Sequence, residues 1–166
     1  MPFHFLSHLR TSIFCLALFA ALPAAVTAAP ASFQATIAFT EQVAPTGASA
    51  PCVLVGTISG SGVASRVGSV ALASTDCINP LPPTYTTYAF ASSHVVLTAS
   101  NGDQIWATYA GLLSADGVIS GTYFIYGGTG RFAKATGGGT VNGFEVIQPS
   151  TGSGSGELQL QGFLLF

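Results

Sequence analysis

Apolar and polar residues alternate over short stretches along most of this chain, and turns that contain glycine separate the stretches. A period of two places successive side chains on opposite faces of a strand, whereas an amphipathic helix needs a period of about 3.6 residues. After residue 30 no helical period persists for more than a turn or two. The pattern therefore predicts eight β-strands, at 33–42, 52–60, 66–74, 88–99, 103–113, 118–126, 139–147 and 157–166.

Two dipeptides, Asn101-Gly102 and Asp116-Gly117, predict tight two-residue hairpins of type I′. Such turns place Leu97 opposite Trp106. The sheet face that we expect to point inward then carries Val95, Leu97, Trp106, Thr108, Leu112, Ile119, Tyr123 and Ile125. The opposite face carries His94 and Asp103, but it also carries the apolar and aromatic residues Ile105, Tyr109, Phe124 and Tyr126. Since an apolar outer face needs cover, we expect a homo-oligomer.

Proline and glycine mark the longer connections. The segment 76–87 contains Pro80, Pro82 and Pro83, and it is predicted to be a loop because proline cannot donate to a strand ladder. The Gly-Ser tract at 150–156 predicts a flexible hairpin tip. Successive short hairpins favour a closed barrel over a two-layer sandwich, because closure leaves no exposed strand edge.

The first residues have the features of a secretory signal peptide. Arg10 precedes an apolar run at 11–26, and Val26-Thr27-Ala28 is a small-residue cleavage pattern. A membrane anchor is the alternative, but the run is shorter than the ~20 residues that a spanning helix needs, and it contains Pro23. We therefore expect a signal peptide at 1–28, a single β-barrel domain at 29–166, and a secreted or periplasmic protein.

Charge and cysteine content narrow the partners and the compartment. Beyond Ala28 the chain has three Lys and Arg residues against six Asp and Glu residues, which argues against nucleic acid as a partner because few cations are present to neutralise phosphates. Cys52 and Cys77 are predicted to form a disulfide in an oxidising compartment. The alternative, a reactive thiol, has no partner histidine nearby in the sequence.

Few residues could carry chemistry. His94 is the only histidine beyond the predicted leader, so neither a Ser-His-Asp triad nor a metal site can be assembled, and no metal is expected. Glu41 and Glu145 are candidate acid-base catalysts if they face an apolar interior, although solvated strand positions are the alternative. Arg66 could close the cavity mouth over an anionic group, or remain in solvent. Trp106 and Tyr123 could line a ligand pocket, or simply fill the core.

One turn carries a family resemblance. An apolar run at 122–126 leads into Gly127-Gly128-Thr129-Gly130-Arg131-Phe132. This predicts a strand that ends at a glycine turn formed by Gly127, Gly128 and Gly130, with Phe132 packed across one barrel end. A phosphate-binding loop is the alternative, but the Gly-Lys-Ser/Thr ending is missing. The turn resembles the signature turn of the dirigent and allene oxide cyclase barrels, most clearly from 101 to 143.

The resemblance implies an all-β fold, an eight-stranded antiparallel up-and-down barrel that encloses a small apolar cavity and assembles as a trimer. It also implies that no cofactor is needed. We expect the interior to bind a small hydrophobic molecule. Alternatively, the barrel could act as a cofactor-independent cyclase or isomerase, or guide the stereochemistry of a coupling begun elsewhere.

A different class is an eight-stranded outer-membrane barrel. Phe166, Leu158, Leu160 and Leu164 lie at alternate positions that share one face of the last predicted strand, as in the apolar outer band of such a barrel. Gly162 interrupts that parity, and the second and third predicted strands have small residues on both faces, so we expect a barrel that is not embedded in a membrane.

Overall fold

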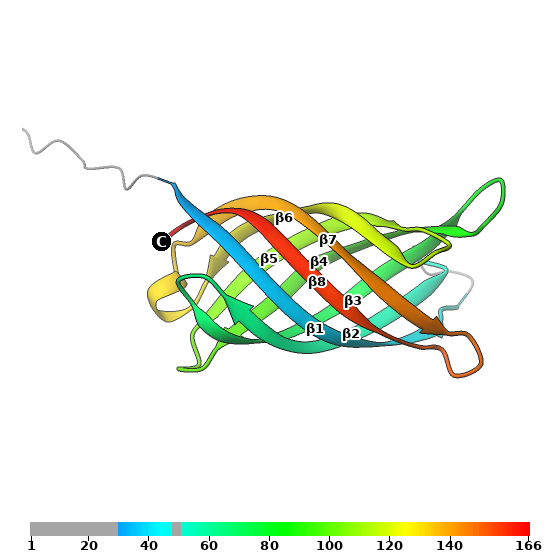
Figure 1. Ribbon diagram of the computed structural model, residues 1–166, viewed down its shortest axis with the longest axis horizontal. Coiled ribbons are helices and arrows are strands. Elements are labelled where there is room, and N and C mark those ends of the chain that lie inside the picture. The colour runs from blue at the N-terminus through cyan, green and yellow to red at the C-terminus, as the bar shows by residue number, and fades with distance from the viewer. Residues whose placement is uncertain (1–29, 48–50) are drawn as a thin grey trace, which may run out of the picture.

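The computed structural model describes residues 30–47 and 51–166, and these form one closed barrel (Figure 1). Its eight strands are β1 (Ala31–Pro45), β2 (Leu54–Ala64), β3 (Gly68–Leu81), β4 (Thr87–Ala99), β5 (Gln104–Leu113), β6 (Val118–Gly128), β7 (Thr136–Gln148) and β8 (Ser153–Leu165). Each strand pairs antiparallel with the next, and β8 pairs with β1. The predicted eight-stranded up-and-down barrel is confirmed. The predicted signal peptide at 1–28 lies outside the described residues.

The interior of the barrel is its hydrophobic core. Along β1 the residues Phe33, Ala35, Ile37 and Phe39 are buried, whereas the residues between them are exposed. This alternation is the period of two expected for a strand with one buried face. Within 30–47 and 51–166, no helix is long and apolar enough to cross a bilayer.

The register of the two tight hairpins differs from the prediction by one residue. Leu97 lies opposite Ile105, not Trp106. The amide of Ala99 donates to the carbonyl of Asp103 at 2.8 Å, and only Gly102 in this loop has a positive φ, of 87°. The loop is therefore a type I turn followed by a glycine bulge, with three residues where a type I′ turn has two. Gly117, with φ 83°, makes the same kind of turn between β5 and β6.

This extra residue inverts the predicted faces of β5. Ile105 is fully buried and Tyr109 lies inside the barrel, while Trp106 lies on the outer face. The predicted inward position of Trp106 was therefore wrong, and so were those of Thr108 and Leu112. The inward residues predicted on β4 and β6 are buried as expected: Val95, Leu97, Ile119, Tyr123 and Ile125. On the outer face Trp106 lies beside His94 and Tyr126, with ring centroids 6.1 and 6.5 Å away.

The proline-rich segment is shorter than predicted. β3 continues to Leu81, so the first half of 76–87 is strand and the turn occupies only 82–86. Pro80 is one residue from the end of β3, where the loss of one amide donor is tolerated. Likewise β8 begins at Ser153, inside the predicted Gly-Ser tip.

The two ends of the barrel differ. We call the end with the β2–β3, β4–β5 and β6–β7 turns the closed end, because Phe33, Phe132 and Leu164 are fully buried there. The other four turns form the open end, on the opposite side of Figure 1. The predicted disulfide between Cys52 and Cys77 is confirmed. It connects the segment just before β2 to strand β3, near the open end.

Candidate functional site

The glycine turn lies at the closed end and has a structural explanation. A Cβ on Gly128 would lie 2.0 Å from the carbonyl oxygen of Gln104, and Gly130 has a positive φ of 53°. The following 3-10 turn, η1 (Gly130–Phe132), directs Phe132 into the core, and its ring centroid lies 5.0 Å from that of the exposed Phe166. A Cβ on Gly127, in contrast, would meet only the Trp106 ring at 3.6 Å.

Arg66 is also at the closed end, in the β2–β3 turn, with a φ of 65°. Its carbonyl accepts a hydrogen bond of 3.3 Å from the Arg131 guanidinium, which lies 4.6 Å from the centroid of Phe132. Arg66 is thus far from the open end, so it does not border the cavity described next. The Arg131 side chain is exposed to solvent, and its guanidinium also packs against the ring of Phe132 at the closed end.

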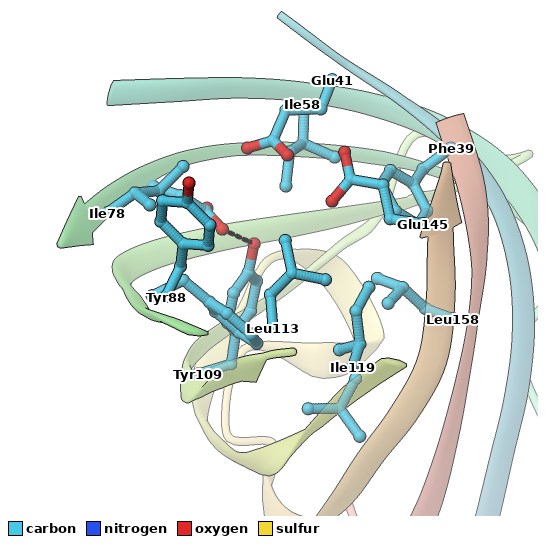
Figure 2. Close-up of a pocket in the computed structure, with 13 residues that line it drawn as sticks. Phe39, Glu41, Ile58, Ile78, Tyr88, Tyr109, Leu113, Ile119, Glu145 and Leu158 are labelled. Carbon is cyan, nitrogen blue, oxygen red and sulfur yellow. Dashed lines mark hydrogen bonds between the residues drawn. The ribbon is translucent and has the colours of Figure 1, made fainter. Parts of the chain in front are cut away.

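A cavity occupies the interior at the open end (Figure 2). Most of its wall is apolar, and it leaves ≈ 40 Å³ for the centres of water-sized molecules, where one water needs about 10–15 Å³. It therefore has room for a few non-hydrogen atoms without any rearrangement. The lining residues are Phe39, Glu41, Ile58, Asp76, Ile78, Tyr88, Phe90, Tyr109, Leu113, Ile119, Val141, Glu145 and Leu158.

Three carboxyl groups enter this apolar cavity. Glu41 comes from β1, Asp76 from β3 and Glu145 from β7, with exposures of 7%, 3% and 5%. The sequence pointed to Glu41 and Glu145 as candidates, and the structure brings them together. Asp76 was missed because the prolines after it suggested a loop. The alternation of the sequence could have identified Asp76 as an inward residue, because it continues the series of every second residue formed by Val70, Leu72 and Ser74.

Both carboxylate oxygens of Asp76 accept hydrogen bonds. Ser74 Oγ donates a hydrogen bond to its Oδ1 at 2.7 Å, and the Tyr109 hydroxyl donates to its Oδ2. Burial raises the pKa of Asp76, while the two hydrogen bonds act in the opposite direction. Burial and the charge of Asp76 raise the pKa of Tyr109, so this hydroxyl keeps its proton.

Glu41 and Glu145 form a pair of carboxyl groups that are hydrogen-bonded to each other. Their carboxyl groups point toward the same part of the cavity (Figure 2). Burial, and then the negative charge of Glu145, raise the pKa of Glu41 from 4.5 to about 8. Burial also raises the pKa of Glu145, whose Oε1 has no hydrogen-bond partner among the described residues. At pH 7 the pair therefore holds a proton.

Two glycines make room for this pair. A Cβ on Gly56 would lie 1.8 Å from Oε1 of Glu41, and a Cβ on Gly154 would lie 1.7 Å from Oε1 of Glu145. Side chains at either position would displace the carboxyl groups. The neighbouring strands β2 and β8 thus leave space for both acids inside the barrel wall.

A second, smaller cavity lies deeper in the barrel, with space of ≈ 30 Å³ by the same measure. It shares Tyr109, Val141 and Leu158 with the first cavity, and Tyr123 is among its lining residues. Burial raises the pKa of Tyr123 to about 12, and its hydroxyl has no hydrogen-bond partner within the described part of the chain. Tyr123 therefore faces the interior, whereas Trp106 lies outside both cavities.

The arrangement can hold and exchange protons in an apolar environment. In the described ranges no three His, Cys, Asp or Glu residues are grouped so that they could hold a metal ion. Comparison of the chain with protein family models, with curated proteins and with solved structures found no match. The cavity and its carboxyl groups are therefore the basis for a functional proposal.

Proposed function

We propose that the barrel binds a small, largely apolar molecule in the cavity at its open end. The observation that carries the proposal is the wall itself, in which aliphatic and aromatic side chains surround a few convergent polar groups. Ligand sites of small barrels have this composition. The size of the cavity favours a compact ligand, or one that reaches the deeper cavity by moving Tyr109, Val141 or Leu158.

The distribution of polar residues argues against a barrel embedded in an outer membrane. Such a barrel has an apolar outer band and a polar interior. Here the interior is mostly apolar, and the outer faces of β1 and β8 carry Gln34, Thr36, Gln159 and Gln161. The disulfide is consistent with an extracellular or periplasmic location. We propose that the protein is secreted or periplasmic.

A cofactor-independent isomerase or cyclase is the second candidate, as the resemblance to allene oxide cyclase and dirigent barrels implies. It is favoured by the pKa of Glu41, which is raised to about 8 beside a second buried carboxyl group. One carboxyl of the pair can donate a proton to a substrate oxygen while the other accepts one from carbon, so that the pair ends with the same number of protons. The apolar walls would hold the substrate in a reactive shape.

The binding proposal can be tested with benzene and 1-butanol as probes, using NMR shifts of the cavity methyl groups. Ile119→Phe fills the cavity and should weaken binding of both probes by about tenfold or more. Val118→Phe adds a similar ring at the neighbouring outward position, which is exposed, and should leave binding unchanged. If neither probe binds the wild-type protein, the proposal fails.

A further inference from the structure

We infer that the open-end cavity takes a small organic cation, a protonated primary amine with a short apolar chain, whose ammonium group lies between Glu41 and Glu145. This inference rests on the proposed function and names the class of ligand. The unpartnered Oε1 of Glu145, on a side chain that is 5% exposed and lines the cavity, marks the place where a donor is missing.

Charge complementarity supports a cation over a neutral or anionic ligand. Three carboxyl groups line the cavity, and no Lys, Arg or His does so among the residues that the structure describes. The basic residues Arg66, Arg131 and Lys134 lie in turns at the closed end. A buried charge without a counterion is unfavourable, so a bound cation would restore the balance.

The hydrogen-bond pattern assigns the ammonium to one pair of carboxyl groups. Asp76 already accepts bonds from Ser74 and Tyr109. Glu145 Oε1 accepts none from the described residues, and an ammonium group has three donors and no acceptor.

The charged groups that face Glu41 are Glu145 on β7 and Asp76 on β3, with the phenols Tyr88 on β4 and Tyr109 on β5. From β2, β6 and β8 the cavity receives only Ile58, Ile119 and Leu158.

The rest of the site suits the apolar part of such a ligand. Phe39, Phe90 and Ile78 line the same cavity, and aromatic faces also attract cations. A hollow of ≈ 500 Å³ on the outside of the open end shares Tyr88 and Glu145 with the cavity, and Asp116 lines it as well. The hollow therefore places a further carboxylate, that of Asp116, beside the cavity at the open end.

The test compares butylammonium with 1-butanol and butyrate, which have similar chains and different charge. Calorimetry at pH 8 should show butylammonium binding about tenfold or more tightly than 1-butanol, and no binding of butyrate. The double variant Glu41→Gln, Glu145→Gln keeps the side-chain volumes and should abolish this preference. The control variant Glu157→Gln makes the same kind of change on the outer face of β8, and it should leave the preference for butylammonium intact.

Proton release on the wild-type protein gives a second readout that needs no variant. Since the carboxyl pair holds a proton below pH 8, a bound ammonium should displace it, and affinity should rise by up to about tenfold per pH unit between pH 6 and pH 8. Butanol binding should not change with pH in this way.

Equal affinity for butylammonium and 1-butanol would overturn the inference and leave the proposed function standing. So would amine binding that releases no proton, or that survives the double Glu→Gln change. If butylammonium, 1-butanol and benzene all fail to bind, the inference and the proposed function fail together.

Discussion

At the scale of single residues, Glu41 and Glu145 occupy inward positions on strands whose other inward side chains are mostly apolar. Burial raises the pKa of both groups, so the folded barrel binds protons more tightly than the unfolded chain does. Protons bound preferentially by the folded state stabilise it at low pH, and that stabilisation is lost as pH rises through the folded pKa.

We therefore expect the free energy of unfolding to fall as pH rises from about 4.5 to about 8, by roughly 1 kcal/mol per pH unit or somewhat more. Urea denaturation at pH 5, 6, 7 and 8 measures the slope. The Glu41→Gln, Glu145→Gln variant should have a much smaller slope, while Glu157→Gln should behave like wild type. Stability that rises with pH over this range would contradict the assignment.

At the scale of elements, two neighbouring glycines of β6 make different demands on space. A Cβ on Gly128 would collide with the Gln104 carbonyl and lie 2.9 Å from Phe132 Cβ, whereas a Cβ on Gly127 would be at ordinary contact distance from Trp106. Gly128→Ala should lower the free energy of unfolding by about 1–3 kcal/mol or more, because the backbone must move. Gly127→Ala should change it by about 0.5 kcal/mol or less. Equal effects of the two changes in thermal melts would remove the structural role given to Gly128.

The disulfide acts at the same scale, because it connects the segment before β2 to β3. The two cysteines are 25 residues apart, and closing such a loop is worth roughly 3–4 kcal/mol on the chain-entropy model. Replacing both Cys52 and Cys77 by Ser should therefore lower stability by about that amount. In the oxidised protein neither residue should react with an alkylating reagent, and quantitative labelling without reductant would contradict the pairing.

At the scale of the whole molecule, the outer surface is divided. The outer faces of β1 and β8 are mostly polar, although Phe163 on β8 is exposed, whereas β6 and β7 expose Val118, Phe124, Tyr126, Phe144 and Val146. An exposed apolar face of this kind favours self-association, and we propose that the protein forms a homo-oligomer.

We predict that light scattering will give the wild-type protein a mass of several chains. Phe124→Glu places a charge on a side chain that is 58% exposed, and it should shift the protein toward a single chain without lowering its melting temperature. Gln159→Glu, on the polar outer face of β8, should keep the wild-type mass. A wild-type mass equal to one chain would contradict self-association.

The sequence by itself determined the number of strands, the closed barrel and the disulfide pair. The strand count follows from local information, because a period of two identifies a strand wherever it occurs. The closed barrel was favoured by the short hairpins together with the family resemblance, and the disulfide by the presence of only two cysteines beyond the predicted leader. The same alternation placed Glu41 and Glu145 on strands among apolar neighbours, although it did not decide which way Glu145 faces.

Only the tertiary structure decided the register of β5 and the composition of the site. One additional residue in each of two turns moved Trp106 outside and Tyr109 inside, since a slip of one residue exchanges the two faces of a strand. The meeting of Glu41, Asp76 and Glu145 depends on barrel closure. It also depends on the space that Gly56 leaves on β2, beside the strand of Glu41, and that Gly154 leaves on β8, beside the strand of Glu145. Contacts between residues distant in the chain are invisible to a local pattern, and for that reason the acidic cavity emerged only with the fold.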